Sequence, residues 1–134
     1  MIERRIQAYK DNLFSSDYIL LKRNYVITNL ILLEKVSAGV NFCGLDIFPI
    51  IYFYAEDKSC EIECGALSNQ LEQIKSVCPK VWVFSFPYNW PDYSITYFIE
   101  KKYNVAKPAT IVLNNKVFEY PQRKEDLLKE IGCS

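Results

Sequence analysis

The chain has 134 residues, of which half are hydrophobic and 15% aromatic, with 16 basic and 16 acidic side chains. This length suits a single compact domain, and the apolar content excludes global disorder. Zero net charge argues against a protein that binds nucleic acid through bulk electrostatics. We therefore expect no nucleic-acid partner.

The sequence contains no histidine. Ser-His-Asp and Cys-His catalytic pairs are therefore impossible within the chain, as are zinc sites that need imidazole. Any chemistry must use cysteine, carboxylate, lysine, tyrosine or backbone groups. Since no cluster supplies four metal ligands, we expect neither a metal nor another cofactor; an iron–sulfur cluster that bridges two chains is the remaining metal alternative.

The N-terminal third predicts helix, because residues 2–36 contain neither Gly nor Pro. Ser15–Asp17 supply a break and an N-cap, so we expect two helices, the second from about Asp17 to Lys35. Gly39 follows as a C-terminal signal. Apolar residues cover a wide face of the second helix, which predicts packing against the rest of the domain or pairing in a homodimer.

The longest apolar stretch of this region, Tyr25–Leu33, is shorter than the roughly 20 residues that span a bilayer. The first twelve residues lack the apolar centre of a signal peptide. The sequence thus predicts no direct membrane span and a soluble chain. The compartment stays open between the cytoplasm and an extracytoplasmic domain whose anchor lies upstream.

Beyond these helices the chain alternates short β-rich and helical runs. Apolar, β-branched and aromatic residues at 47–55 and 81–86 predict strands buried on both faces, as in the centre of a parallel sheet. Asn114 and Asn115 predict the two-residue turn of a hairpin over 110–120. The predicted helices are 59–77, about 92–104 and 124–132.

The resulting order, β-α-β-α-β-β-α, predicts an α/β fold in which helices cover both faces of a mixed sheet. A βαβ unit gives the parallel part of such a sheet, and the hairpin gives the antiparallel part. We divide the chain into a helical N-terminal extension, residues 1–42, and a mixed-sheet domain, residues 43–134.

This second region resembles the thioredoxin superfamily over about residues 47–133. Its first strand leads through IIYFYAEDKSCEIEC into a helix whose first turn carries Cys60 and Cys64. The segment VAKPATIVLNNKVF is similar to the thioredoxin segment in which a cis-proline precedes the hairpin, and Pro108 takes that position. The cysteine motif is CxxxC, whereas thioredoxins have CxxC.

The resemblance implies a thioredoxin-like fold and thiol–disulfide exchange on protein or small-molecule disulfides. Cys60 would be the nucleophile and Cys64 the resolving thiol, with an external reductant or partner oxidoreductase and no cofactor. Lys107, Pro108 and Ala109 would position an extended substrate beside a cis peptide bond at Pro108. An ordinary trans-proline before a strand is the alternative.

The residues themselves allow a Cys60–Cys64 disulfide, because positions i and i+4 of a helix share a face with Cα atoms about 6 Å apart. A helix N-terminus favours the thiolate at Cys60, whereas acidic neighbours disfavour it. Lys58 offsets only part of that acidity. We expect Cys60 to be a slower nucleophile than its thioredoxin counterpart. The acidic neighbours are Glu56, Asp57, Glu61 and Glu63.

A structural role for the same cysteines is the alternative. Cys60, Cys64 and Cys78 belong to one apolar stripe of the predicted helix, and a buried cysteine packs like a small hydrophobe. The chain would then be a redox-inactive scaffold or interaction module that self-associates through its N-terminal helices.

The remaining cysteines have less specific positions. We expect Cys78 in the core and Cys133, near the C-terminus, as an inert exposed thiol. Cys43 is expected to be a free structural cysteine in the linker, with a third redox thiol as the alternative.

Overall fold

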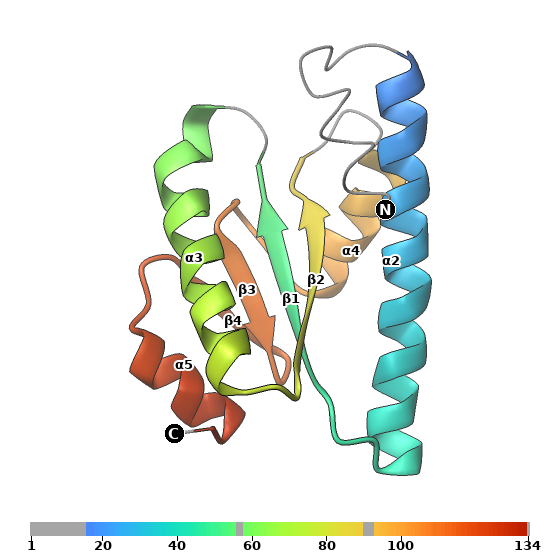
Figure 1. The fold of residues 1–134 in the computed structure, drawn as a ribbon. Helices are drawn as coiled ribbons and strands as arrows, with labels where there is room; N and C mark the ends of the chain where they lie inside the picture. Colours follow the sequence, from blue (N-terminus) through green and yellow to red (C-terminus); the bar gives the residue numbers. More distant parts are fainter. Residues whose placement is uncertain (1–15, 56–57, 90–92, 134) are drawn as a thin grey trace.

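The computed structural model describes residues 16–55, 58–89 and 93–133, and in them a mixed sheet lies between two layers of helices (Figure 1). This confirms the predicted α/β class with a mixed sheet. In chain order the elements are α2 (Ser16–Cys43), β1 (Phe48–Tyr54), the 3-10 turn η2 (Lys58–Cys60), α3 (Glu61–Val77), β2 (Val81–Pro87), α4 (Tyr93–Lys102), β3 (Thr110–Leu113), β4 (Lys116–Glu119) and α5 (Lys124–Ile131).

The strands are ordered β2-β1-β3-β4 in the sheet. Strand β1 is parallel to β2 and antiparallel to β3, and β4 pairs antiparallel with β3. Helix α3 forms the crossover between the two parallel strands. Asn114 and Asn115 have φ values of 50° and 63°, so they form the predicted hairpin turn between β3 and β4.

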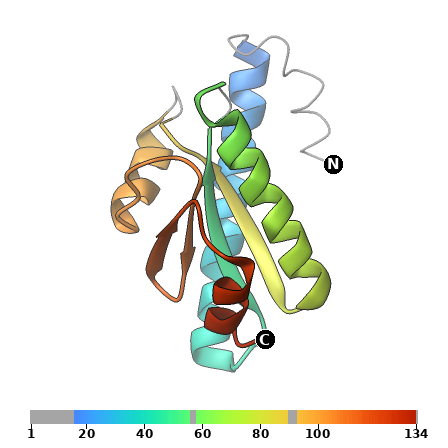
Figure 2. The ribbon, with the colours of Figure 1, turned by 90° about the vertical axis from the view of Figure 1, so that its left-hand side faces the viewer.

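Helices α3 and α5 cover one face of the sheet, the side nearer the viewer in Figure 2. The α3 residues of this core have the 3–4 spacing predicted for its apolar stripe. They pack on the side chains of β1 that point to this face, Ile50 and Tyr52. The core residues from the two helices are Cys64, Leu67, Leu71, Ile74, Leu127 and Ile131.

Helices α2 and α4 cover the other face, where β1 contributes Ile51 and Phe53. Helix α2, strand β2 and helix α4 all contribute buried residues to this core. Helix α2 therefore packs against the rest of the domain, which is the first of the two alternatives predicted for it. Homodimer formation through the helix stays a prediction. The core residues from these three elements are Val26, Leu33, Val36, Phe84, Phe86 and Ile99.

The predicted end of α2 near Lys35 is wrong, because the helix continues to Cys43. Gly39 lies inside the helix, where a Cβ atom on this residue would come within 3.0 Å of the Leu45 side chain. The backbone N–H of Leu45 also donates to the Gly39 carbonyl at 3.0 Å. Gly44, with φ +66°, has the left-handed conformation that ends the helix. The helix predicted before Ser15 lies outside the described residues.

By length and composition alone, Asp17–Cys43 of α2 would also suffice to cross a membrane, a longer candidate than the Tyr25–Leu33 stretch. Core helices of soluble proteins and N-terminal signal sequences meet the same criterion. In this fold polar contacts also join α2 to the rest of the domain. The Asn29 amide donates to the Ser85 carbonyl at 2.8 Å, and Lys102 pairs with Glu34 at 3.1 Å.

Two adjacent leucines test the packing of α2 on the sheet. Leu33 is 1% exposed, whereas Leu32 is 43% exposed. Because a truncated core leucine leaves a cavity, Leu33→Ala should lower the free energy of unfolding by roughly 2–4 kcal/mol. Leu32→Ala should cost less than about 1 kcal/mol. Urea denaturation measures both, and equal losses would contradict the packing described here.

Candidate functional site

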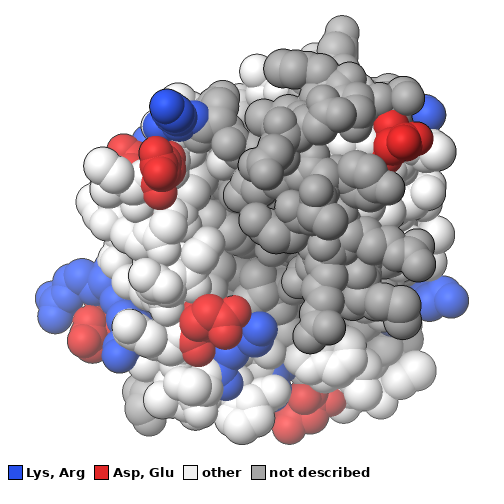
Figure 3. All heavy atoms as spheres, turned by 45° about the horizontal axis from the view of Figure 1, so that its top comes forward, with Lys and Arg blue, Asp and Glu red and all other residues white. Residues whose placement is uncertain are grey.

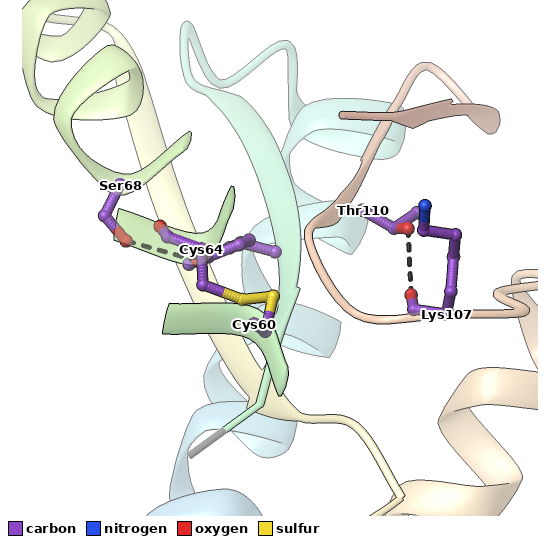
Figure 4. The surroundings of a disulfide bond; sticks show 6 residues. Cys60, Cys64, Ser68, Lys107 and Thr110 are labelled. Carbon is purple, nitrogen blue, oxygen red and sulfur yellow. Dashed lines mark hydrogen bonds between the residues drawn. A yellow bond between two sulfur atoms is a disulfide. The ribbon is translucent and has the colours of Figure 1, made fainter. Parts of the chain in front are cut away.

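A disulfide joins Cys60 and Cys64 at the start of α3 (Figure 4). Cys60 is the last residue of η2 and the N-cap of α3, and Cys64 lies one turn further on. Their Cα atoms are 5.3 Å apart, close to the separation predicted for i and i+4. The cysteines singled out in the sequence are therefore bonded to each other, at the point where the chain from β1 enters the helix.

Both cysteines of this bond are packed inside the protein. Cys60 is 2% exposed and Cys64 is 7% exposed, and both belong to the core between α3 and the sheet. A protein substrate can reach sulfur only when one of the two cysteines moves outward. Thiol–disulfide exchange at this site therefore requires a local displacement of the chain around it.

Tyr52 of β1 lies beneath Cys64. Its hydroxyl donates to the Cys64 carbonyl at 3.0 Å, and the Ser68 hydroxyl donates to the Tyr52 oxygen at 3.2 Å. Burial raises the pKa of Tyr52, so the phenol stays a neutral donor at physiological pH. Neither residue belongs to a sequence motif, although a tyrosine in a doubly buried strand must find a partner for its hydroxyl.

The segment of Lys107, Pro108 and Ala109 lies in the surroundings of the disulfide (Figure 4). Ala109 is fully buried and belongs to the same core cluster as Cys60 and Cys64. Lys107 and Pro108 are partly buried. The structure thus brings the predicted substrate-positioning segment and the predicted cysteine pair to one place, although about 45 residues separate them in the sequence.

The prediction of a cis peptide bond at Pro108 is wrong, because the cis bond among the described residues is Tyr120–Pro121. The chain turns before β3 through Ala109, which has a left-handed φ of +57°. The Thr110 hydroxyl closes this turn by donating to the Lys107 carbonyl at 2.9 Å. That carbonyl is therefore already engaged within the chain.

A buried lysine of α2, Lys22, lies beside Tyr54, the last residue of β1. The Lys22 ammonium of α2 contacts the Tyr54 hydroxyl and lies 4.7 Å and 5.6 Å from the ring centroids of Tyr54 and Tyr25. Lys22 thus joins the N-terminal helix, predicted as a separate extension, to the end of β1.

The charged neighbours predicted around Cys60 are only partly described. Lys58, Glu61 and Glu63 are exposed to solvent, which screens their effect on the sulfur. Glu56 and Asp57 lie outside the described residues. Figure 3 views this end of the molecule, where acidic and basic side chains are interspersed over the part of the surface that is described.

A second disulfide joins Cys78 and Cys133, whose Cα atoms are 6.0 Å apart. Cys78 is buried at the C-cap of α3, as predicted, but the expectation of an inert exposed thiol at Cys133 is wrong. The bond ties the end of α3 to the chain that follows α5. Cys43 is the free cysteine of the described chain; it is exposed and is the last residue of α2 rather than part of a linker.

The part of the chain that the structure describes contains no group of three or more cysteine, aspartate or glutamate residues placed to hold a metal ion. Comparisons of the chain with protein-family models, with curated proteins and with solved structures found no match.

The two disulfides should contribute unequally to the free energy of unfolding. The Cys78–Cys133 bond joins residues 55 positions apart, whereas the Cys60–Cys64 bond joins residues 4 positions apart. Chain entropy assigns about 4 kcal/mol to the longer loop and about 2 kcal/mol to the shorter one. Under oxidising conditions Cys133→Ala should therefore lower the free energy of unfolding about twice as much as Cys60→Ala. Urea denaturation measures both variants; a larger loss for Cys60→Ala would contradict these roles.

Proposed function

We propose that this chain is a thioredoxin-like domain that catalyses thiol–disulfide exchange through Cys60 and Cys64. The observation that carries the proposal is the disulfide at the first turn of α3, directly after the central strand of the sheet. The strand order β2-β1-β3-β4, with a parallel pair, an antiparallel hairpin and a final helix, supports the resemblance stated from the sequence.

The exchange would proceed in two steps in the reducing direction. The Cys60 thiolate attacks one sulfur of a substrate disulfide; a Cys60–substrate bond forms, the substrate S–S bond breaks, and the departing sulfur takes up a proton. The Cys64 thiol then loses its proton and attacks Cys60, which releases the second substrate thiol. Two electrons pass to the substrate, and a thiol reductant or partner dithiol restores the reduced cysteines.

The local charges act in opposite directions on this reaction. Free N–H groups at the start of α3 favour a thiolate at Cys60, whereas Glu61 and Glu63 disfavour it. Because those glutamates are exposed, water weakens their influence. The proposal keeps Cys60 as a nucleophile slower than that of thioredoxins, and Lys107, Pro108 and Ala109 as the segment that positions the substrate.

The burial of both cysteines favours a second candidate function, a redox-inactive scaffold or interaction module. A disulfide that is closed off from solvent is protected from exchange and can serve as a local clamp at the start of α3. In that case the exposed apolar residues of α2, such as Leu20 and Ile31, would contribute to self-association.

Reduction of insulin disulfides by dithiothreitol separates the two functions. We expect the wild-type protein to accelerate the reaction and Cys60→Ser to give only the uncatalysed rate, because the attacking sulfur is gone. Cys43→Ser is the matched control, since it removes an exposed free thiol and should keep the wild-type rate. Equal rates for wild type and Cys60→Ser would reject the enzyme and leave the scaffold.

A further inference from the structure

The two cysteines of the Cys60–Cys64 pair are held unequally by the rest of the chain. The carbonyl of Cys64 accepts the hydrogen bond from Tyr52. Cys60, at the N-cap, makes no side-chain capping hydrogen bond and belongs to the short η2 turn. One end of the disulfide is thus attached to the central strand, and the other end belongs to a single turn.

Tyr52 is a rigid point of attachment. Its backbone lies in the middle of β1, in register with Ser85 of β2 on one side and Ile111 of β3 on the other. Its ring is buried in the core that also contains Cys60 and Cys64. A group that is fixed by two strand ladders and by core packing moves little when a neighbouring surface turn opens.

Ser68 directs the hydroxyl proton of Tyr52. A phenol has a single proton, and its oxygen accepts a hydrogen bond from Ser68. The proton is therefore left to point at the Cys64 carbonyl. Ser68 lies one helical turn after Cys64 on α3, so the two hydrogen bonds join the first turns of the helix to β1.

We propose that Tyr52 is a positioning residue that holds Cys64 against β1 in both oxidation states, so that the η2 turn with Cys60 is the part that moves during exchange. This inference rests on the proposed function. The hydrogen bond is made to a backbone oxygen and not to sulfur, so cleavage of the S–S bond does not break it. The resolving thiol consequently stays in place while Cys60 moves out to a substrate and returns.

The proposal has a measurable consequence. If Cys64 is held in place, its effective concentration toward the Cys60 sulfur increases. It is obtained from the equilibrium in which two glutathione thiols reduce the Cys60–Cys64 disulfide, giving the protein dithiol and one glutathione disulfide. After alkylation, the tryptic peptide 59–75 reports this pair alone, since it contains no other cysteine. The measurement does not require turnover of any substrate.

Tyr52→Phe, which removes only the hydroxyl, should lower the effective concentration about three- to tenfold, because Cys64 of the variant dithiol is no longer held in place and must be ordered again when the disulfide forms. Tyr88→Phe is the matched control, because the Tyr88 hydroxyl also donates to a backbone carbonyl, that of Ala106 at 2.8 Å. It should change the effective concentration by less than about twofold. An unchanged value for Tyr52→Phe, or an equal shift for Tyr88→Phe, would overturn the inference.

A second variant covers the case in which Tyr52→Phe does not fold. Ser68→Ala alters an exposed side chain on α3 and should shift the equilibrium in the same direction by a smaller factor; no shift would overturn the inference. The proposed function fails independently of this result. If Tyr52→Phe shifts the equilibrium while the wild type does not reduce insulin, the positioning role stands and the enzyme is rejected.

Discussion

The rest of the structure depends on the burial of β1 on both faces. Its residues from Ile50 to Phe53 are all buried, and alternate side chains enter the two cores on opposite sides of the sheet. Helices α3 and α5 therefore pack on one side of the strand, and α2 and α4 on the other. Because the Tyr52 hydroxyl of β1 also donates to the Cys64 carbonyl, the strand that unites the two cores is the same strand that holds Cys64.

Helix α3 is cross-linked at both ends, and the two cross-links differ in kind. At its start the Cys60–Cys64 bond closes a single turn, whereas at its end the Cys78–Cys133 bond joins segments 55 residues apart. Reduction of the first bond frees only a local turn that the sheet still holds through the Cys64 carbonyl. Reduction of the second removes a constraint on α3 and α5 together, which suits a structural bond.

Local features were predictable from the sequence, and features that depend on distant contacts were not. The Asn114–Asn115 turn follows from the φ preference of asparagine, and the spacing of Cys60 and Cys64 allows the bond that the structure contains. In contrast, α2 continues past Gly39 because that residue accommodates Leu45, and Cys133 finds its partner only once α5 is folded against α3. The thioredoxin-like assignment remains a proposal.

The central claim is that Cys60–Cys64 is a reversible redox pair and Cys78–Cys133 is a structural bond. Titration of the native protein with glutathione buffers of increasing reducing strength, followed by alkylation and peptide mass analysis, tests it most directly. The account predicts that peptide 59–75 takes up two alkyl groups while Cys78 and Cys133 remain unlabelled. Reduction of both bonds together, or of Cys60–Cys64 only upon unfolding, would contradict the claim.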